Sequence, residues 1–325
     1  MEQVLTIDLI SALDRSNGKL NVYVLPSVAE NSSENIDKDT EEAKSERLSY
    51  ILTYFYRGDF YLITSGLTHL GDESRYLPGM KMTITSQSDD PEECLVDIKA
   101  VRITAPTVWH KSGKIKDVSI CHGQPILCAA PPGGGKSYMA KTILDTVENY
   151  DRSVRVYRNL FGERPDDDLG NGTVDCNSSA ILDYQLYILY REYTMALRDA
   201  HGGMKVIIGT DSYTRMIETL TNKYAHTHLL SGGISSSVKS MVSRLFRMSG
   251  KVGEGYLSIV ATALWAKSNS GWKSIYLELS SVSTAEFFPH VRSGKLDYTR
   301  REPTSSMDRG LLEIKLFGKI YELEL

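Results

Sequence analysis

Long hydrophobic runs are absent from this sequence. Among its 325 residues, no apolar stretch approaches the roughly 18 residues that a membrane-spanning helix requires. The N-terminus, Met1-Glu2-Gln3, carries an acid where a signal peptide carries bases. From these two absences we expect an intracellular protein that is not inserted in a membrane.

Cysteine and histidine are scarce, and neither forms a ligand cluster. The four cysteines are Cys94, Cys121, Cys128 and Cys176. None makes a C-x-x-C pair, so we expect reduced thiols rather than a zinc site or a disulfide framework. Of the seven histidines, only His226 and His228 lie close together, and no acid or cysteine stands at ligand spacing from them. We interpret this pair as part of a solvated loop.

A strong charge imbalance is also missing. The formal net charge of −4 gives the chain no overall basic surface. A nucleic-acid partner would therefore have to meet a local positive surface, such as the lining of a channel.

The turn between Ala130 and Tyr138 carries the clearest chemistry. It follows a short apolar strand that begins at Ile126 and precedes a run with helical spacing. Glycines there let backbone N–H groups approach phosphate oxygens, and the N-terminus of a helix adds partial positive charge. The pattern, in which Ala130 replaces the usual first glycine, indicates a phosphate-binding loop; Lys136 would reach the β- and γ-phosphates, and Ser137 would bind Mg²⁺. The residues expected around the phosphates are Pro132, Gly133, Gly134, Gly135, Lys136, Ser137 and Tyr138.

The length and the turn signals divide the chain into three parts. A chain of 325 residues has room for about two domains. Residues 1–120 contain predicted strands and, from Glu46, a run with apolar residues at helical spacing, which predicts a small α+β accessory or assembly domain. Residues 121–302 form the predicted nucleotide-binding core, and residues 303–325 alternate like a strand pair, which predicts a C-terminal β extension.

Strands alternate with helices beyond the loop. The predicted strands are 153–157, 205–212, 257–264, 274–279 and 287–291, and the predicted helices are 179–200 and 235–248. This alternation predicts an α/β fold with a mainly parallel sheet flanked by helices. Its ligand would lie at the carboxyl ends of the strands.

Two acidic residues follow predicted strands at that edge. Asp211 ends a buried strand, where an aspartate can hold Mg²⁺ through water; the alternative is a turn or helix cap. Glu163 comes just after a strand that we expect to neighbour the phosphate-loop strand. A carboxylate there could orient and deprotonate an attacking water, or it could be a solvated loop acid beside Arg164.

Five motifs occur in order between residues 120 and 302. They are Gly133-Gly134-Gly135-Lys136-Ser137, Phe161-Gly162-Glu163, Thr210-Asp211-Ser212, Ser231-Gly232-Gly233-Ile234-Ser235 and Val291-Arg292-Ser293-Gly294. This set resembles the hexameric packaging NTPases of the cystoviruses, the double-stranded RNA bacteriophages. The resemblance implies a RecA-like core, ATP or another nucleoside triphosphate with Mg²⁺, and a homo-oligomeric, hexameric ring. It also implies single-stranded RNA and a viral capsid protein as partners, and a place at the procapsid vertex of the virion or in the host cytoplasm.

The resemblance also implies roles for single residues. Lys136 would bind phosphate, Glu163 would be the catalytic base, and Asp211 the metal carboxylate. Arg292 matches an arginine finger that a neighbouring subunit inserts into the site. The second finger of the family falls closest to Arg300.

RNA contacts and nucleotide sensing are where the sequence departs from the family. The sensor asparagine of the relatives matches Trp265 here, which leaves sensing to Asn269 or to no residue. The lysines expected to grip RNA are Lys267, Lys273 and Lys239. A base could stack on Trp265 or Trp272, although packing is the alternative for both.

The sequence therefore predicts a ring-shaped NTPase that packages single-stranded RNA into a procapsid and hydrolyses ATP at subunit interfaces. A RecA-like DNA helicase or recombinase would share every core motif. A small-molecule P-loop kinase, or a capsid-associated nucleotide-binding protein without motor activity, are further alternatives.

Overall fold

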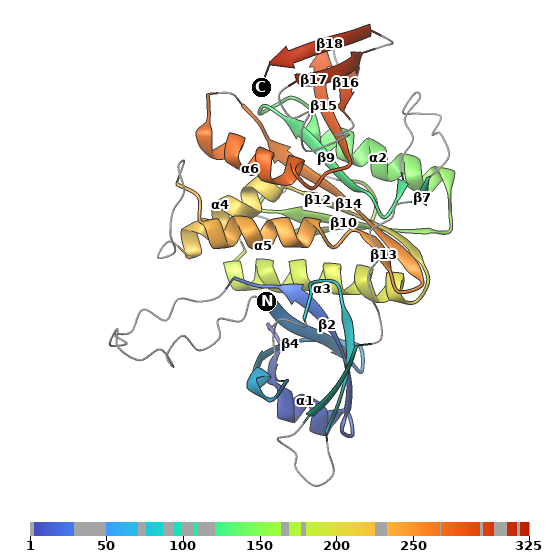
Figure 1. Ribbon diagram of the computed structural model, residues 1–325, viewed down its shortest axis with the longest axis vertical. Coiled ribbons are helices and arrows are strands. Elements are labelled where there is room, and N and C mark those ends of the chain that lie inside the picture. The colour runs from blue at the N-terminus through green and yellow to red at the C-terminus, as the bar shows by residue number, and fades with distance from the viewer. Residues whose placement is uncertain are drawn as a thin grey trace.

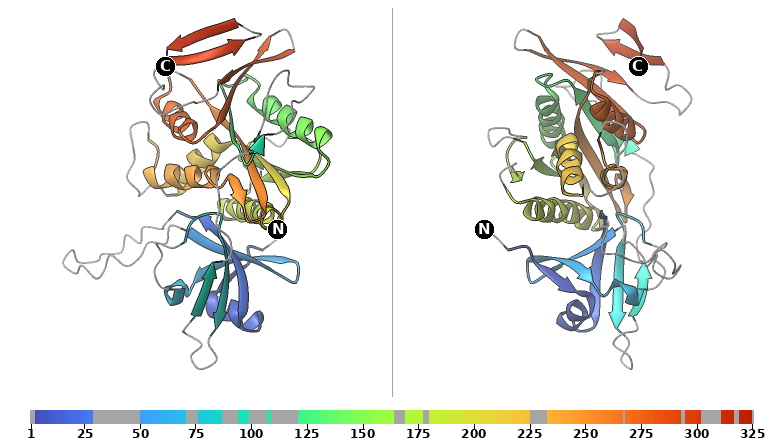
Figure 2. Two further views of the ribbon diagram at one scale, coloured as in Figure 1. Left: turned by 45° about the vertical axis from the view of Figure 1, so that its right-hand side comes forward. Right: turned by 90° about the vertical axis from the view of Figure 1, so that its left-hand side faces the viewer.

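The described residues form two large β-sheets and a separate two-stranded pair, and one long helix packs against both of the large sheets. The structure, a computed structural model, describes residues 3–28, 50–70, 76–86, 94–98, 107–108, 121–163, 169–176, 180–224, 233–266, 268–292, 295–301, 311–316 and 319–324. Figures 1 and 2 show the N-terminal sheet at one end of the molecule, the core sheet in the middle and the C-terminal hairpin at the other end.

The N-terminal sheet has six strands in the order β1-β4-β3-β2-β5-β6. Its elements are β1 (Thr6–Asp8), α1 (Leu9–Arg15), β2 (Lys19–Pro26), β3 (Tyr50–Tyr56), β4 (Asp59–Ser65), the 3₁₀ turn η2 (Leu67–Leu70), β5 (Lys81–Ser86) and β6 (Cys94–Ile98). Only the pairing of β1 with β4 is parallel. This mixed sheet with its short helix is the predicted small α+β module. A separate two-stranded pair, β7 (Thr107–Val108) and β8 (Cys121–His122), follows it.

The helix predicted from Glu46 is wrong, because Tyr50–Tyr56 forms strand β3. Tyr50, Leu52 and Tyr54 are buried on one face of this strand, and Thr53 is buried on the other. A strand covered on both faces loses the polar–apolar alternation that distinguishes strands from helices in a sequence.

The core sheet has the order β11-β10-β12-β14-β9-β15-β16-β17-β18, with β13 paired to β14. Its strands are β9 (Pro125–Ala130), β10 (Val154–Phe161), β11 (Thr173–Cys176), β12 (Lys205–Asp211), β13 (Gly250–Val252), β14 (Gly255–Leu264), β15 (Ala285–Arg292), β16 (Lys295–Arg301), β17 (Leu311–Leu316) and β18 (Lys319–Glu324). The pairings from β11 to β15 are all parallel, and those from β15 to β18 are antiparallel. The C-terminal hairpin thus continues the core sheet through β16.

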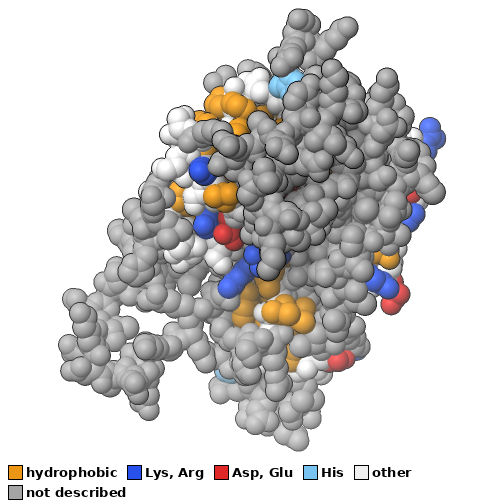
Figure 3. Space-filling model, turned by 45° about the horizontal axis from the view of Figure 1, so that its top comes forward, with side chains coloured by type: hydrophobic (Ala, Val, Ile, Leu, Met, Phe, Trp, Pro, Cys, Tyr) orange, Lys and Arg blue, Asp and Glu red, His pale blue; other side chains and the backbone are white. Residues whose placement is uncertain are grey.

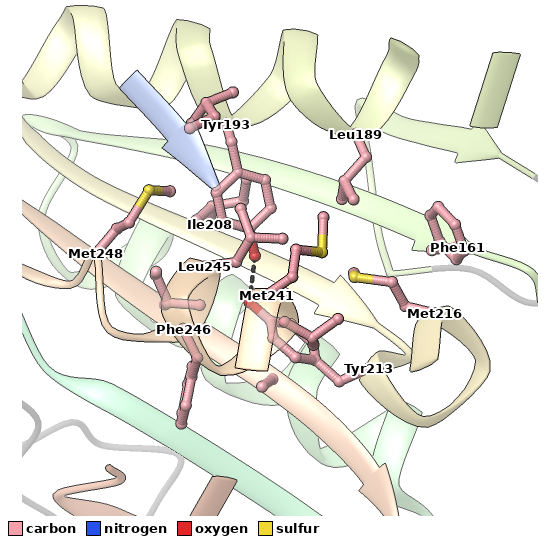
Figure 4. Packing of buried hydrophobic residues seen from close by; sticks show 14 of the residues in the cluster. Phe161, Leu189, Tyr193, Ile208, Tyr213, Met216, Met241, Leu245, Phe246 and Met248 are labelled. Carbon is pink, nitrogen blue, oxygen red and sulfur yellow. Dashed lines mark hydrogen bonds between the residues drawn. The ribbon is translucent and has the colours of Figure 1, made fainter. Parts of the chain in front are cut away.

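Helices cover both faces of the core sheet. The helices are α2 (Lys136–Tyr150), α3 (Leu182–His201), α4 (Tyr213–Lys223), α5 (Ser236–Phe246) and α6 (Ser270–Ser280). Apolar residues of α2 pack with alternate residues of β9, β10 and β12 in one buried cluster, and those of α3 to α6 pack in a second. Figure 4 shows part of the second cluster, in which the hydroxyl groups of Tyr193 and Tyr213 are hydrogen-bonded. The predicted α/β fold, a mainly parallel sheet flanked by helices, is confirmed.

The strand predicted at 274–279 is wrong, because these residues belong to α6. Ile275 and Leu279 are buried at helical spacing, and Leu277 between them is 46% exposed. In the sequence, the same three residues stand two apart, like one face of a strand. Their spacing therefore fits a strand as well as a helix. Helix α4 and the strands β11 and β13 were not predicted. The pair His226 and His228 lies outside the described residues.

The N-terminal module is fastened to α3 by buried contacts. Thr53 of β3 shares a 2.9 Å hydrogen bond with Thr194 of α3, and Tyr187 of α3 donates to the Phe60 carbonyl at 3.0 Å. The Arg198 guanidinium lies 4.9 Å from the centre of the Phe55 ring. Because α3 also packs on the core sheet, it is buried on two sides and holds the module in a fixed place.

Within the part of the chain that the structure describes, no helix is both long and apolar enough to cross a lipid bilayer.

Replacing Tyr187 with phenylalanine should lower the free energy of unfolding by about 1 kcal/mol, because the buried Phe60 carbonyl loses a donor. Chemical denaturation measures the change. Tyr138→Phe makes the same chemical change at a 58% exposed tyrosine and should have almost no effect. Equal stabilities of the two variants would contradict a buried docking contact at this point.

Candidate active site

The phosphate loop connects β9 to α2 and has a backbone that requires glycine. Gly133 and Gly135 have φ values of +74° and +89°, in the left-handed region that other residues rarely adopt. A Cβ atom on Gly134 would stand 2.8 Å from the Ala130 Cβ and 3.0 Å from the Pro131 carbonyl oxygen. Residues 131–133 are exposed, and Lys136 begins the helix. The loop therefore presents backbone N–H groups and a helix N-terminus to solvent at the carboxyl edge of the sheet.

The ends of three parallel strands bring three charged side chains together beside this loop. The Lys136 Nζ lies 3.4 Å from the Asp211 Oδ1 and 3.8 Å from the Glu163 Oε1. Asp211 is the last residue of β12, and Glu163 stands two residues beyond the end of β10. The predicted convergence of loop, Glu163 and Asp211 is thus present in the fold.

The neighbour predicted for the strand that precedes Glu163 is wrong. This strand, β10, pairs with β12 and β11, and both β12 and β14 lie between it and β9. Glu163 nevertheless reaches the site, because Gly162 has a φ of +69° and turns the chain after the strand. A Cβ on Gly162 would also lie 3.3 Å from the Cβ of Arg215 on α4.

The carboxylate of Asp211 is fully buried and only partly paired. Its side chain is 0% exposed, against 13% for Lys136 and 12% for Glu163. Thr262 of β14 donates a short hydrogen bond to the Asp211 Oδ1. The Asp211 Oδ2 is buried and has no hydrogen-bond partner among the described residues. A buried carboxylate oxygen without a partner is costly, so this atom points to a missing ligand.

These donors fit a magnesium ion that is bound together with a nucleotide. Mg²⁺ prefers oxygen ligands and is usually held by one or two protein groups plus substrate phosphates. The Ser137 hydroxyl and the free Asp211 Oδ2 are oxygen donors, and the Lys136 Nζ lies 3.5 Å from the Ser137 Oγ. In the described ranges, no group of three or more His, Cys, Asp or Glu residues could hold a metal by itself.

The two arginines predicted as fingers occupy different levels of the sheet. Arg292 ends β15, which pairs with the phosphate-loop strand β9, and it stands opposite Lys295 at the turn of a hairpin. Arg300 pairs with Phe287, five residues back along β15, which is about 17 Å. The backbone therefore places Arg292 at the same edge of the sheet as the phosphate loop and Arg300 well inside the sheet.

The lysines predicted to contact RNA have different surroundings. Lys239 of α5 lies 3.5 Å from the Glu278 Oε2 and 3.5 Å from the Ser274 Oγ of α6, so its amine already joins two helices. Lys273 is exposed on α6. Lys267 lies outside the described residues.

The tryptophans and the proposed sensor have structural partners. Trp265 packs edge-on against Tyr276 at 6.0 Å, and the Trp272 indole donates to the Glu218 Oε1 at 2.9 Å. The Asn269 Oδ1 accepts from the Trp272 amide and caps α6. These contacts match the packing alternative for both rings and give Asn269 a capping role.

Among the described residues that touch the three charged groups, Thr262 is one that sequence reasoning missed. It stands between Ala261 and Ala263 in an otherwise apolar strand, so a hydroxyl at that position was the available signal. Its hydrogen-bond partner, Asp211, belongs to β12. The sequence alone does not show that β12 and β14 are neighbours in the sheet.

The structure describes the side chains of two of the four cysteines. Cys128 and Cys176 are free and buried, as predicted for reduced thiols. Burial raises the pKa of the Cys176 thiol to about 12 and raises that of Cys128 as well, so neither is a reactive thiolate at neutral pH.

The comparisons with known proteins give one related sequence and two solved structures that are similar over part of the chain. No family model matches the chain. The transcription termination factor Rho of Streptobacillus moniliformis is 26% identical over 211 residues, which is 61% of this chain and 45% of that protein. The chain therefore spans less than half the length of this curated relative.

Two solved structures of type III secretion ATPases are also similar to part of this chain. A prototypical ATPase from the type III secretion system of pathogenic bacteria is 21% identical, with a TM-score of 0.49, over 58% of this chain and 57% of that one. The assembled ATPase EscN of enteropathogenic E. coli is 20% identical, with a TM-score of 0.49, over 58% of this chain and 48% of that one.

Replacing Gly134 with alanine should weaken nucleotide binding, because the new Cβ meets the Pro131 carbonyl oxygen and the loop must shift. We expect the Kd of a fluorescent ATP analogue to rise at least about tenfold, which corresponds to about 1.4 kcal/mol. Gly202→Ala adds the same methyl group between α3 and β12, at a glycine with a φ of −75° where the nearest atom, the Asp199 carbonyl oxygen, is 3.3 Å away, and it should leave the Kd unchanged. An unchanged Kd for Gly134→Ala would show that phosphate does not bind in this loop.

Proposed function

We propose that the chain is a RecA-like, ring-forming NTPase that uses ATP and Mg²⁺ to move single-stranded RNA. The observation that carries this proposal is the meeting of Lys136, Asp211 and Glu163 at the end of a glycine-rich loop. Transfer of a phosphoryl group to water requires three groups: an amine that binds phosphate, a buried carboxylate that holds the metal, and a more accessible carboxylate that activates the water.

Each residue has a defined task in this proposal. The backbone of residues 133–135 and the Lys136 amine bind and orient the phosphates. The Glu163 carboxylate, 12% exposed, accepts the proton of the attacking water. Mg²⁺, bound with the nucleotide by Ser137 and Asp211, would neutralise charge on the phosphate oxygens. Lys136 lies near both carboxylates, and phosphate would compete with them for its amine.

Support for RNA as the partner comes from sequence similarity. The related protein is named as a transcription termination factor, and RNA is the product of transcription. Figure 3 shows one face of the molecule, where the described lysines and arginines stand in small groups beside hydrophobic side chains and form no broad basic field. Our candidates for contacts with RNA are Lys273, which is exposed on α6, together with Lys239 of α5 and Lys267, which lies outside the described residues.

The finer part of the proposal follows the resemblance to the cystovirus NTPases. We propose a hexameric ring at the procapsid vertex that packages RNA, with capsid protein as a second partner. Arg292, at the loop edge of the sheet, would reach the site of the adjacent subunit, and Arg300 is the weaker candidate for a second finger. Arginine at the γ-phosphate can accelerate hydrolysis by about 10³-fold or more.

Phosphate release from ATP, measured with single-stranded RNA, with single-stranded DNA and without nucleic acid, tests this function. We expect RNA to stimulate the wild type most. Glu163→Gln should bind ATP normally and lower turnover about 100-fold or more, since it cannot accept the proton.

Glu254→Gln is the matched control for this experiment, because Glu254 is exposed in the turn that precedes β14, at the opposite edge of the sheet. Normal turnover by Glu163→Gln would contradict the assigned base. Stimulation by DNA in place of RNA would favour a DNA helicase or recombinase. Net transfer of phosphate to a small acceptor would indicate a kinase.

A further inference from the structure

The orientation of the Asp211 carboxylate depends on a second strand. Within the described residues, the donors to the Asp211 Oδ1 are the Lys136 amine at 3.4 Å and the Thr262 hydroxyl. Register explains the second contact: Thr210 of β12 pairs with Ala261 of β14, so Asp211 and Thr262 follow side by side on one face of the sheet. With Oδ1 engaged, the Oδ2 is the oxygen left for a ligand.

The two donors differ in what happens when a nucleotide binds. The Lys136 amine is mobile on a four-carbon stem and would turn toward the phosphates. The Thr262 hydroxyl is attached to a buried central strand by one rotatable bond and keeps its place. Once Lys136 has moved, Thr262 is the remaining donor that fixes the rotation of the Asp211 carboxylate.

A purely structural role does not account for this hydroxyl. Thr262 is fully buried between Cys128 of β9 and Asp211 of β12, where valine would fill the same shape. Burying a hydroxyl costs free energy unless it is hydrogen-bonded, and the bond it makes is to the candidate metal ligand.

We propose that Thr262 is a positioning residue for the metal. Its hydroxyl holds the Asp211 Oδ1 so that Oδ2 faces the place where Mg²⁺ binds with the nucleotide. The inference rests on the nucleotide-binding part of the proposed function and is independent of RNA. Residues that orient a metal ligand typically change metal affinity or activity by about 10- to 100-fold when they are replaced.

The test is a magnesium titration of nucleotide binding by the full chain. A fluorescent ATP analogue is bound to the wild type, Thr262→Val and Thr262→Ser, first with EDTA and then with increasing MgCl₂. For Thr262→Val we expect the half-saturating Mg²⁺ concentration to rise about tenfold or more, while binding in EDTA stays unchanged. Thr262→Ser keeps the hydroxyl and should behave like the wild type.

Thermal unfolding of each variant shows whether the fold is intact, and Thr262→Ala replaces the valine variant if that variant does not fold. The inference is overturned if Thr262→Val needs no more Mg²⁺ than the wild type, or if Thr262→Ser is as impaired as Thr262→Val. A wild type that binds no nucleotide would instead overturn the proposed function itself. If RNA does not stimulate hydrolysis, the conclusion about Thr262 and Mg²⁺ is unaffected, because the titration contains no RNA.

Discussion

The contact between the Lys136 amine and the buried Asp211 carboxylate is the interaction on which the site depends. A fully buried carboxylate is costly to keep charged unless opposite charge and hydrogen bonds compensate it. Lys136 supplies the charge, and Thr262 supplies a hydrogen bond. In the proposed function, phosphate would replace the carboxylates as the partner of the lysine.

The sheet makes this contact from segments that are far apart in the sequence. Strands β9, β12 and β10 deliver the loop, Asp211 and Glu163 to one edge because all three are parallel. Helix α3 packs on one face of this sheet, and its outer side binds the N-terminal module through buried contacts such as the hydrogen bond between Thr53 and Thr194. Helix α3 therefore packs against the N-terminal module and the core sheet at once, and α5 also contacts β2 of the module.

The sequence predicted the features that depend on local pattern. The phosphate loop, the long helix α3 and the parallel strands carry strong periodicity or glycine signals, and they are present as expected. Two kinds of feature were missed. In the segment 50–56, burial on both faces removes the alternation of polar and apolar residues, and in the segment 270–280 the apolar residues fit both the helical and the strand spacing. The partner of Thr262 and the true neighbours of β10 depend on strand order, which no local pattern encodes.

The most direct test is a crystal structure of the protein with Mg²⁺ and a non-hydrolysable ATP analogue. The account predicts phosphate oxygens at the Lys136 amine, which would no longer lie within an ion-pair distance of both carboxylates. It also predicts Mg²⁺ between the Ser137 hydroxyl and the Asp211 Oδ2, directly or through water, with Thr262 still on Oδ1. A nucleotide bound elsewhere, or a bound nucleotide with the Lys136–Asp211 contact unchanged, would contradict it.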